Sequence, residues 1–183
     1  MLSTDSGNDD YFEELADKLA SSKDDADLFG TIVNAPFDDP SVTTELGLGF
    51  LSLVLVNPKT ATIDRIAISK TETAQGAIDV TVKRFEDLKV PVGHRANLVN
   101  KVISSGKSQR TTDWNDLLTP VLKPEEARLN QAGAGISTSY IYPLKARSGG
   151  AIIFQFYVEP SQIGPDQTHF MKRYSRLVSE ALV

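Results

Sequence analysis

The chain has 183 residues, enough for one domain with a single core, and its 40% hydrophobic and 23% charged residues are ordinary for a globular protein. It contains no cysteine, which excludes disulfides, thiolate metal sites, thiol nucleophiles and a chromophore attached through a thioether. Half of the 24 acidic residues lie in the first 45 positions, where Lys18 and Lys23 are the only bases. The remainder is modestly basic, which either attracts an anionic ligand or is an ordinary solvated surface.

Nothing in the sequence indicates a membrane or secreted protein. The longest apolar run, residues 50–56, is interrupted by Ser52 and is far shorter than the roughly 20 residues needed to cross a bilayer. Asp5 and Asp9 stand where a secretory signal would be basic and then apolar. We therefore expect a cytoplasmic location and no membrane partner.

The first third of the chain predicts two helices and a hairpin. Residues 1–10 are acidic and lack periodicity, which predicts a flexible leader. An amphipathic helix is then expected from Tyr11, with Asp10 as its N-cap, followed by a short helix that stops before Pro36. The apolar residues 47–56 and the returning segment 63–68 predict two strands joined by a turn.

The middle of the chain is less regular. Residues 72–87 favour a helix only weakly, because Gly76 and several β-branched residues oppose it. Residues 98–103 carry a helical apolar stripe that ends at Gly106, and a short strand or extended loop follows. A helical turn is expected over residues 125–131, and the glycine-rich residues 132–135 predict a hinge.

The last third predicts a second hairpin and a final helix. Residues 139–145 and 151–159 read as strands joined around Gly149 and Gly150, and an amphipathic helix follows Pro165. Together the elements predict one α+β domain over residues 11–183, with a central antiparallel sheet of five to six strands flanked by helices.

Three segments resemble the GAF family of small-molecule-binding and signalling domains. Residues 98–113, LVNKVISSGKSQRTTD, are similar to the family's helix, Gly-Lys turn and strand ending in Asp. Residues 140–156, YIYPLKARSGGAIIFQF, are similar to its hairpin, and residues 163–166 with the final helix are similar to its ending. The resemblance implies a three-layer, GAF/PAS-like fold with the N- and C-terminal helices packed together.

The resemblance also places a ligand pocket on one face of the sheet, under a lid formed by residues 114–137. It implies six candidate ligand-binding residues: Thr111, Asp113, Trp114, Ser137, Ser139 and Ile141. Trp114 could stack on a ring or simply close the core beneath the lid. Asp113 could orient a ligand or cap the next segment. Both alternatives remain open at this stage.

Known activities of GAF domains are mostly excluded by the residues present. Covalent bilin attachment and sulfoxide reduction both need cysteine. Where cyclic-nucleotide-binding members carry Asn-Lys, Phe and Asp-Glu, this chain keeps only Asp166. His94 and His169 have no helical partner of ligand type, so we expect no metal site, and haem ligation by His94 is not favoured. Basic residues are too scattered to predict nucleic-acid binding.

Two functional hypotheses follow. The first is a non-catalytic sensor that binds an unidentified small molecule and signals through its terminal helices. The second is a ligand-free structural module that forms a homodimer through those helices. The second hypothesis depends on a possible apolar seam: Phe12, Leu15, Leu19, Tyr174, Leu177 and Ala181. No catalytic residues are expected in either case.

Overall fold

A single antiparallel sheet organises the chain. The structure is a computed structural model that describes residues 5–183. The sheet has six strands in the order β3-β2-β1-β6-β5-β4, and each neighbouring pair is antiparallel. The strands are β1 (Leu48–Asn57), β2 (Thr62–Ile68), β3 (Val90–Pro91), β4 (Gln109–Thr111), β5 (Thr138–Leu144) and β6 (Gly150–Phe156). The predicted α+β class and both predicted hairpins, β1–β2 and β5–β6, are confirmed.

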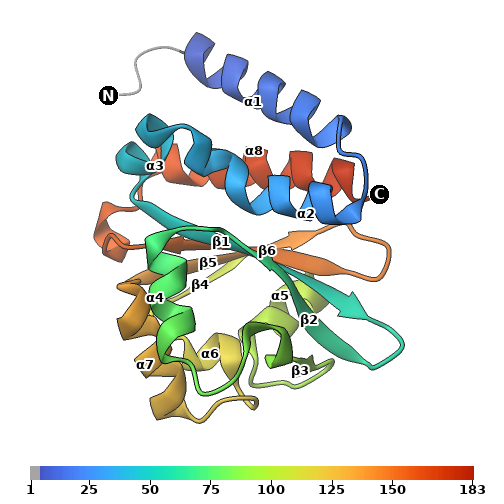
Figure 1. The fold of residues 1–183 in the computed structure, drawn as a ribbon, viewed down its shortest axis with the longest axis vertical. Helices are drawn as coiled ribbons and strands as arrows, with labels where there is room; N and C mark the ends of the chain where they lie inside the picture. Colours follow the sequence, from blue (N-terminus) through green and yellow to red (C-terminus); the bar gives the residue numbers. More distant parts are fainter. Residues whose placement is uncertain (1–4) are drawn as a thin grey trace.

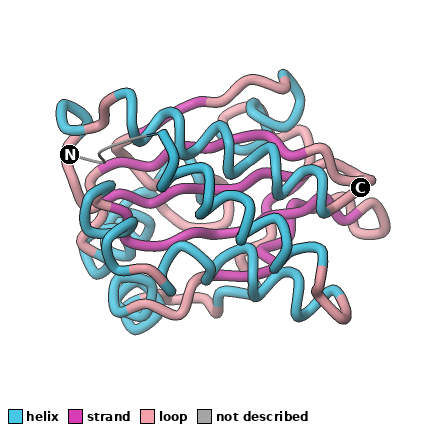
Figure 2. Tube along the Cα trace, turned by 90° about the horizontal axis from the view of Figure 1, so that it is seen from above, coloured by secondary structure: helices cyan, strands magenta, loops and turns pink. Residues whose placement is uncertain are grey.

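One face of the sheet is covered by two layers of helices. These helices are α1 (Asp5–Ala20), α2 (Asp25–Asn34), α3 (Pro40–Leu46) and α8 (Pro165–Ala181). Figure 1 shows α2 and α8 between the sheet and α1. Figure 2, seen from above, shows helices covering the strands that run side by side beneath them. The ring of Phe12 in α1 lies 5.6 Å from that of Phe170 in α8, so the predicted packing of the terminal helices is confirmed.

The opposite face carries four helices. These are α4 (Glu72–Val80), α5 (Leu98–Ser105), α6 (Asn115–Leu118) and α7 (Pro124–Ala134). Three 3₁₀ turns complete the fold: η1 (Ala35–Asp38), η2 (Phe85–Asp87) and η3 (Pro160–Gln162). Successive side chains of a strand point to opposite faces, so β1 supplies Leu51 and Leu53 to one core and Phe50 and Val54 to the other.

The first helix begins earlier than its apolar pattern predicts. It starts at Asp5, so Asp10 lies inside the helix and is not its N-cap. The difference arises because helix propagation needs no apolar side chains once a nucleus exists. The predicted flexible leader is therefore helical over residues 5–10, and residues 1–4 lie outside the described residues.

The predicted hinge at residues 132–135 is wrong. Ala132 to Ala134 belong to α7, and Gly135 ends that helix in the left-handed region with φ of 66°. A Cβ placed on Gly76 would lie 2.3 Å from the carbonyl oxygen of Gly133, and one on Gly133 would lie 2.7 Å from that of Gly76. The two glycines therefore allow the backbones of α4 and α7 to touch, which the spacing of apolar residues cannot reveal.

Candidate functional site

A small cavity lies between the sheet and the helices α4, α6 and α7. Its volume is about 50 Å³, and it opens to solvent. Residues of β1, β2 and β6 form its floor: Phe50, Ser52, Arg65, Ile68, Ile153 and Gln155. The cover has two parts. The segment from α4 to η2 and Leu88 contributes Ala77, Ile78, Thr81, Phe85 and Leu88. The segment from α6 to α7 contributes Trp114, Leu117, Leu118 and Asn130.

The predicted lid is therefore only half of the cover. Residues 114–137 supply one side, and α4 with the turn after it supplies the other. Thr71 caps α4 by accepting a hydrogen bond from the Ala74 N–H at 3.3 Å, which helps this weakly predicted helix to form. Ile78 is 36% exposed and also lines the cavity, so it lies at the mouth.

The size of the cavity limits what it holds in this conformation. A volume of about 50 Å³ accommodates roughly one or two water molecules, whose share of liquid volume is about 30 Å³ each. Pockets for small molecules are typically about 300–1,000 Å³. A ligand larger than a few atoms therefore requires the cover to move away from the sheet.

Arg65 is the one charged side chain that lines the cavity. Its Nη1 donates to the carbonyl oxygen of Leu88 at 3.2 Å, and its Nη2 donates to that of Leu117 at 3.4 Å. Burial lowers the pKa of Arg65 to about 10, so the guanidinium stays charged at neutral pH. Among the described residues, Arg65 forms no ion pair.

A chain of buried hydrogen bonds links Trp114, Ser139 and Gln155 beside the cavity. The indole N–H of Trp114 donates to Ser139 Oγ at 3.0 Å, and the Ser139 hydroxyl contacts Gln155 Oε1. An indole nitrogen only donates, so Ser139 accepts from it and gives its own proton to Gln155. Gln155 and Ser52 both line the cavity, and neither the Gln155 amide nitrogen nor the Ser52 hydroxyl has a hydrogen-bond partner within residues 5–183.

Trp114 is the one predicted site residue that lines the cavity. Its ring meets Phe50 edge to face, with centroids 6.1 Å apart, so it closes the core and borders the cavity at once. Ser139 lies directly behind it, and Ile141 is fully buried in the same core without reaching the cavity. The Ser137 hydroxyl donates to Glu159 Oε1 at 3.2 Å, and Ser137 is not one of the lining residues.

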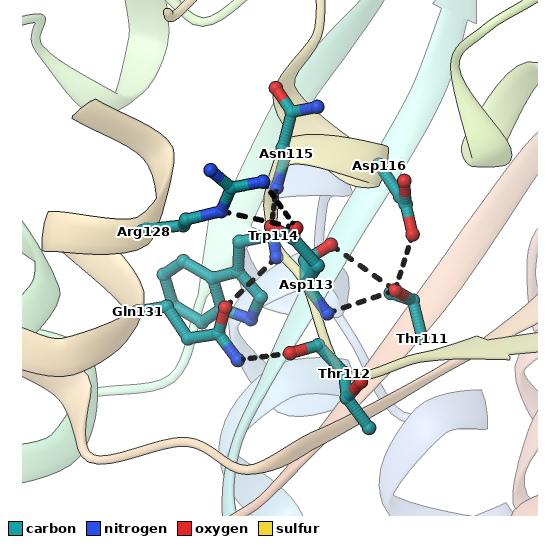
Figure 3. A network of polar contacts seen from close by, with 8 residues as sticks. All are labelled: Thr111, Thr112, Asp113, Trp114, Asn115, Asp116, Arg128 and Gln131. Carbon is teal, nitrogen blue, oxygen red and sulfur yellow. Dashed lines mark hydrogen bonds and ion pairs between the residues drawn. The ribbon is translucent and has the colours of Figure 1, made fainter. Parts of the chain in front are cut away.

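Asp113 and Thr111 have structural contacts away from the cavity. Asp113 accepts from the backbone N–H of Asn115 at 2.9 Å and pairs with Arg128 at 2.8 Å, as Figure 3 shows. The hydrogen bond from Arg128 holds the pKa of Asp113 below its usual range. Thr111 Oγ1 contacts Asp116 Oδ2 at 2.5 Å. The hydrogen bond to the Asn115 N–H agrees with the capping alternative for Asp113, and its role in ligand binding stays a prediction.

The same network fixes α7 against the segment before it. Gln131 Oε1 accepts from the Trp114 backbone N–H at 2.9 Å, and its Nε2 donates to the carbonyl oxygen of Thr112 at 2.9 Å (Figure 3). The same Nε2 donates to the carbonyl oxygen of Ile136 at 3.1 Å. The Gln131 side chain therefore links the start of the segment 114–137, at Trp114, to its end, at Ile136. These hydrogen bonds hold the segment in place where Trp114 enters the core.

Sequence reasoning missed the three polar residues of the floor. A signal was present for two of them. Arg65 follows Ile63 by two positions in a strand, and Gln155 interrupts the apolar run of β6. A polar side chain in an inward-facing strand position is unusual unless it has a partner or a ligand. Ser52 carries a weaker signal, since serine is tolerated in many strands.

The apolar seam proposed for a homodimer is buried within one chain. Phe12, Leu15, Leu19 and Tyr174 are each at most 5% exposed, and they pack in the core on the sheet face covered by α1, α2 and α8. Leu177 and Ala181 pack against the same core. The amphipathic patterns of α1 and α8 are explained by this intramolecular packing, so the seam no longer supports a dimer.

Neither His94 nor a cluster of metal-ligating residues provides a second candidate site within the described residues. His94 lies between β3 and α5, outside the lining, and its buried Nδ1 has no hydrogen-bond partner among the described residues. Within residues 5–183 no three His, Asp or Glu side chains are grouped so as to hold a metal ion. In the same part of the chain, every helix is too short or too polar to cross a membrane.

Comparisons with known proteins identify the fold. No protein-family model and no curated protein sequence matches the chain. Among solved structures, the GAF domain of the Acinetobacter phosphoenolpyruvate-protein phosphotransferase is similar, with a TM-score of 0.65 and 11% identity over 98% of this chain and 94% of that one. The A. aeolicus nlh2 GAF domain in an inactive state has a TM-score of 0.56 and 11% identity over 94% and 93%.

An enzyme shares the same architecture. The free methionine-R-sulfoxide reductase from Neisseria meningitidis, solved with its substrate, has a TM-score of 0.59 and 9% identity over 98% of this chain and 92% of that one. At such low identities the likeness concerns the fold alone. The chain has a GAF-type fold, as the sequence resemblance implies, and this fold occurs both in GAF domains of larger proteins and in a reductase.

Proposed function

We propose that this GAF-type domain is a regulatory module that binds a small molecule in the cavity under α4, α6 and α7. The observation that carries the proposal is a set of polar side chains that keep free hydrogen-bond donors in a largely apolar lining. Arg65, Gln155 and Ser52 come from three different strands and face one space. Buried polar groups normally have partners, and an apolar pocket with a few convergent polar groups is typical of a ligand site.

Ligand entry requires one part of the cover to move. Gly76 contacts the backbone of α7, which holds that part of α4 in place. Beyond it, Ile78 is 36% exposed and Val82 is 59% exposed, so the end of α4 and the turn toward η2 are bound less extensively. We expect this part of the cover to move outward and enlarge the cavity.

A route for the signal runs through β6. Ile153 and Gln155 face the cavity, whereas Phe154 between them faces α8. The ring of Phe154 lies 6.5 Å from that of Phe170 and 6.0 Å from that of Tyr174. A ligand that shifts β6 would therefore change the packing of the C-terminal helix. Spatial contact supports this route, and coupling has to be measured to establish it.

A binding role is favoured over catalysis for a chemical reason. The chain has no cysteine, so it lacks the thiols that reduce a sulfoxide through a disulfide. The polar groups at the cavity are a guanidinium, two carboxamides and hydroxyls, and no histidine or carboxylate accompanies them. The lining therefore offers hydrogen bonds and one positive charge without a general base near neutral pH.

Trp114 provides a direct test of binding. It is the only tryptophan and borders the cavity, so intrinsic fluorescence reports on this site. We expect a member of a panel of organic acids, amino acids, amides and nucleobases to change the emission saturably and to raise the melting temperature. The variant Ala77→Leu, which fills the cavity, should abolish both effects. Ala26→Leu, on an exposed part of α2, should preserve them.

The binding proposal is contradicted if the protein does not respond to the panel. If no member of the panel changes the emission or the melting temperature of the folded protein, the domain has no binding site here and the ligand-free structural module replaces it. A response that persists in Ala77→Leu also contradicts the proposal, because binding then occurs elsewhere.

A further inference from the structure

Arg65 is a cation without a counter-charge. A guanidinium carries five N–H donors, and the two contacts of Arg65 to backbone carbonyls use one on Nη1 and one on Nη2. The Nε–H and one N–H on each terminal nitrogen have no partner within residues 5–183. Its neighbour Asp64 contacts Lys89, Asn57 and Thr62, so it does not neutralise the guanidinium. The charge of Arg65 is thus available to a ligand.

Gln155 adds donors whose orientation is set by the protein. Its Oε1 receives the Ser139 proton, because Ser139 must itself accept from the Trp114 N–H. The two N–H groups of the Gln155 amide are therefore left for the cavity. The Ser52 hydroxyl, also in the lining, can donate as well. Three residues thus present donors to one space, which matches an acceptor-rich group of negative charge.

We infer that the group received by this cavity is a carboxylate, bound by Arg65 and Gln155 with help from Ser52. The inference rests on the function proposed above and names the chemistry of its ligand. A planar guanidinium fits a carboxylate through paired hydrogen bonds. A single cation balances one carboxylate, whereas a phosphate dianion would retain a negative charge beside an apolar wall. The body of the ligand contacts Phe50, Trp114 and Ile153, so it is small and largely apolar.

The test compares acids with their neutral isosteres. The probes are propionate and isobutyrate with propionamide and isobutyramide, titrated at pH 7 and matched ionic strength while Trp114 emission is followed. Wild type should bind each acid at least about tenfold more tightly than its amide, which corresponds to about 1.4 kcal/mol. Arg65→Gln should lose this preference and keep its affinity for the amides. Arg147→Gln, which changes an exposed arginine, should behave as wild type.

Two further readouts keep the inference open to refutation. Circular dichroism and the melting curve establish that Arg65→Gln is folded. If it is not, Arg65→Lys takes its place, and it should bind the acids more weakly than wild type while still preferring them to the amides. If wild type binds acids and amides saturably and with equal affinity, the inference that the ligand carries a carboxylate is wrong, whereas the proposed function is still supported. If none of the four probes binds, the carboxylate is also overturned, and the wider panel then decides the proposed function separately.

Discussion

Replacing Gly76 by alanine tests the contact between α4 and α7 that holds one side of the cavity cover. In the interior of an unhindered helix, Gly→Ala stabilises a protein by about 1 kcal/mol. Here the new Cβ would lie 2.3 Å from the Gly133 oxygen and 3.1 Å from its carbonyl carbon. Both atoms belong to backbone, so no side-chain rotation relieves the clash. The helices must separate by about 1 Å to restore ordinary contact distances of roughly 3.5 Å.

The magnitude follows from two opposing effects. Overpacking costs typically about 1–3 kcal/mol, and the gain in helix propensity offsets about 1 kcal/mol of it. We expect Gly76→Ala to lower the free energy of unfolding by up to about 2 kcal/mol, which for a domain of this size lowers the melting temperature by up to roughly 8 °C. Gly30 is the matched control. It lies inside α2, and a Cβ there would meet nothing within 4 Å.

The assay is urea and thermal denaturation of the three proteins under identical conditions. Gly30→Ala should stabilise by up to about 1 kcal/mol, so the two variants should shift in opposite directions. Trp114 emission in Gly76→Ala should also move to longer wavelength, because displacement of α4 admits water to the cavity. If Gly76→Ala stabilises the protein as Gly30→Ala does, the close approach of α4 and α7 is wrong.

Further predictions concern buried and exposed polar groups. Ser139→Ala should destabilise the protein by about 1–3 kcal/mol in urea denaturation, because it leaves a buried indole N–H and an amide oxygen unpaired. Tyr174→Phe removes a 2.7 Å hydrogen bond to a buried backbone carbonyl and should cost about 1 kcal/mol, whereas Tyr157→Phe, at an exposed position, should cost little; equal effects would contradict this. Since Arg128 lowers the pKa of Asp113, this carboxylate stabilises the folded state above the ordinary aspartate pKa of about 3.9 and loses that contribution as the pH falls through the lowered value. The stability difference between wild type and Asp113→Asn should therefore be constant near neutral pH and shrink below about pH 4; a difference that grows on acidification would refute the ion pair.

Local patterns in the sequence predicted most of the fold. The strands predicted over residues 47–56 and 151–159, their hairpin partners and the amphipathic final helix depend on side chains a few positions apart. The structure contains each of these elements, although β6 ends at Phe156, before the predicted end. The segments resembling GAF domains also indicated the architecture that the solved structures show. The absence of cysteine alone excluded thiol chemistry. Each of these inferences needs only composition or short-range spacing.

Tertiary structure decided the site, because the relevant contacts join residues far apart in the chain. Gly76 and Gly133 read separately as a weak helix position and part of a hinge, but together they form a helix crossing. Asp113 forms an ion pair with Arg128, fifteen positions away, and also accepts a hydrogen bond from the Asn115 N–H. Arg65 lies at an inward-facing position of β2, and only the packing of α4 and α6 over it creates a space in which its charge has no counter-charge. Sequence spacing determines which face a side chain takes, whereas the element that arrives opposite that face determines what the side chain can bind.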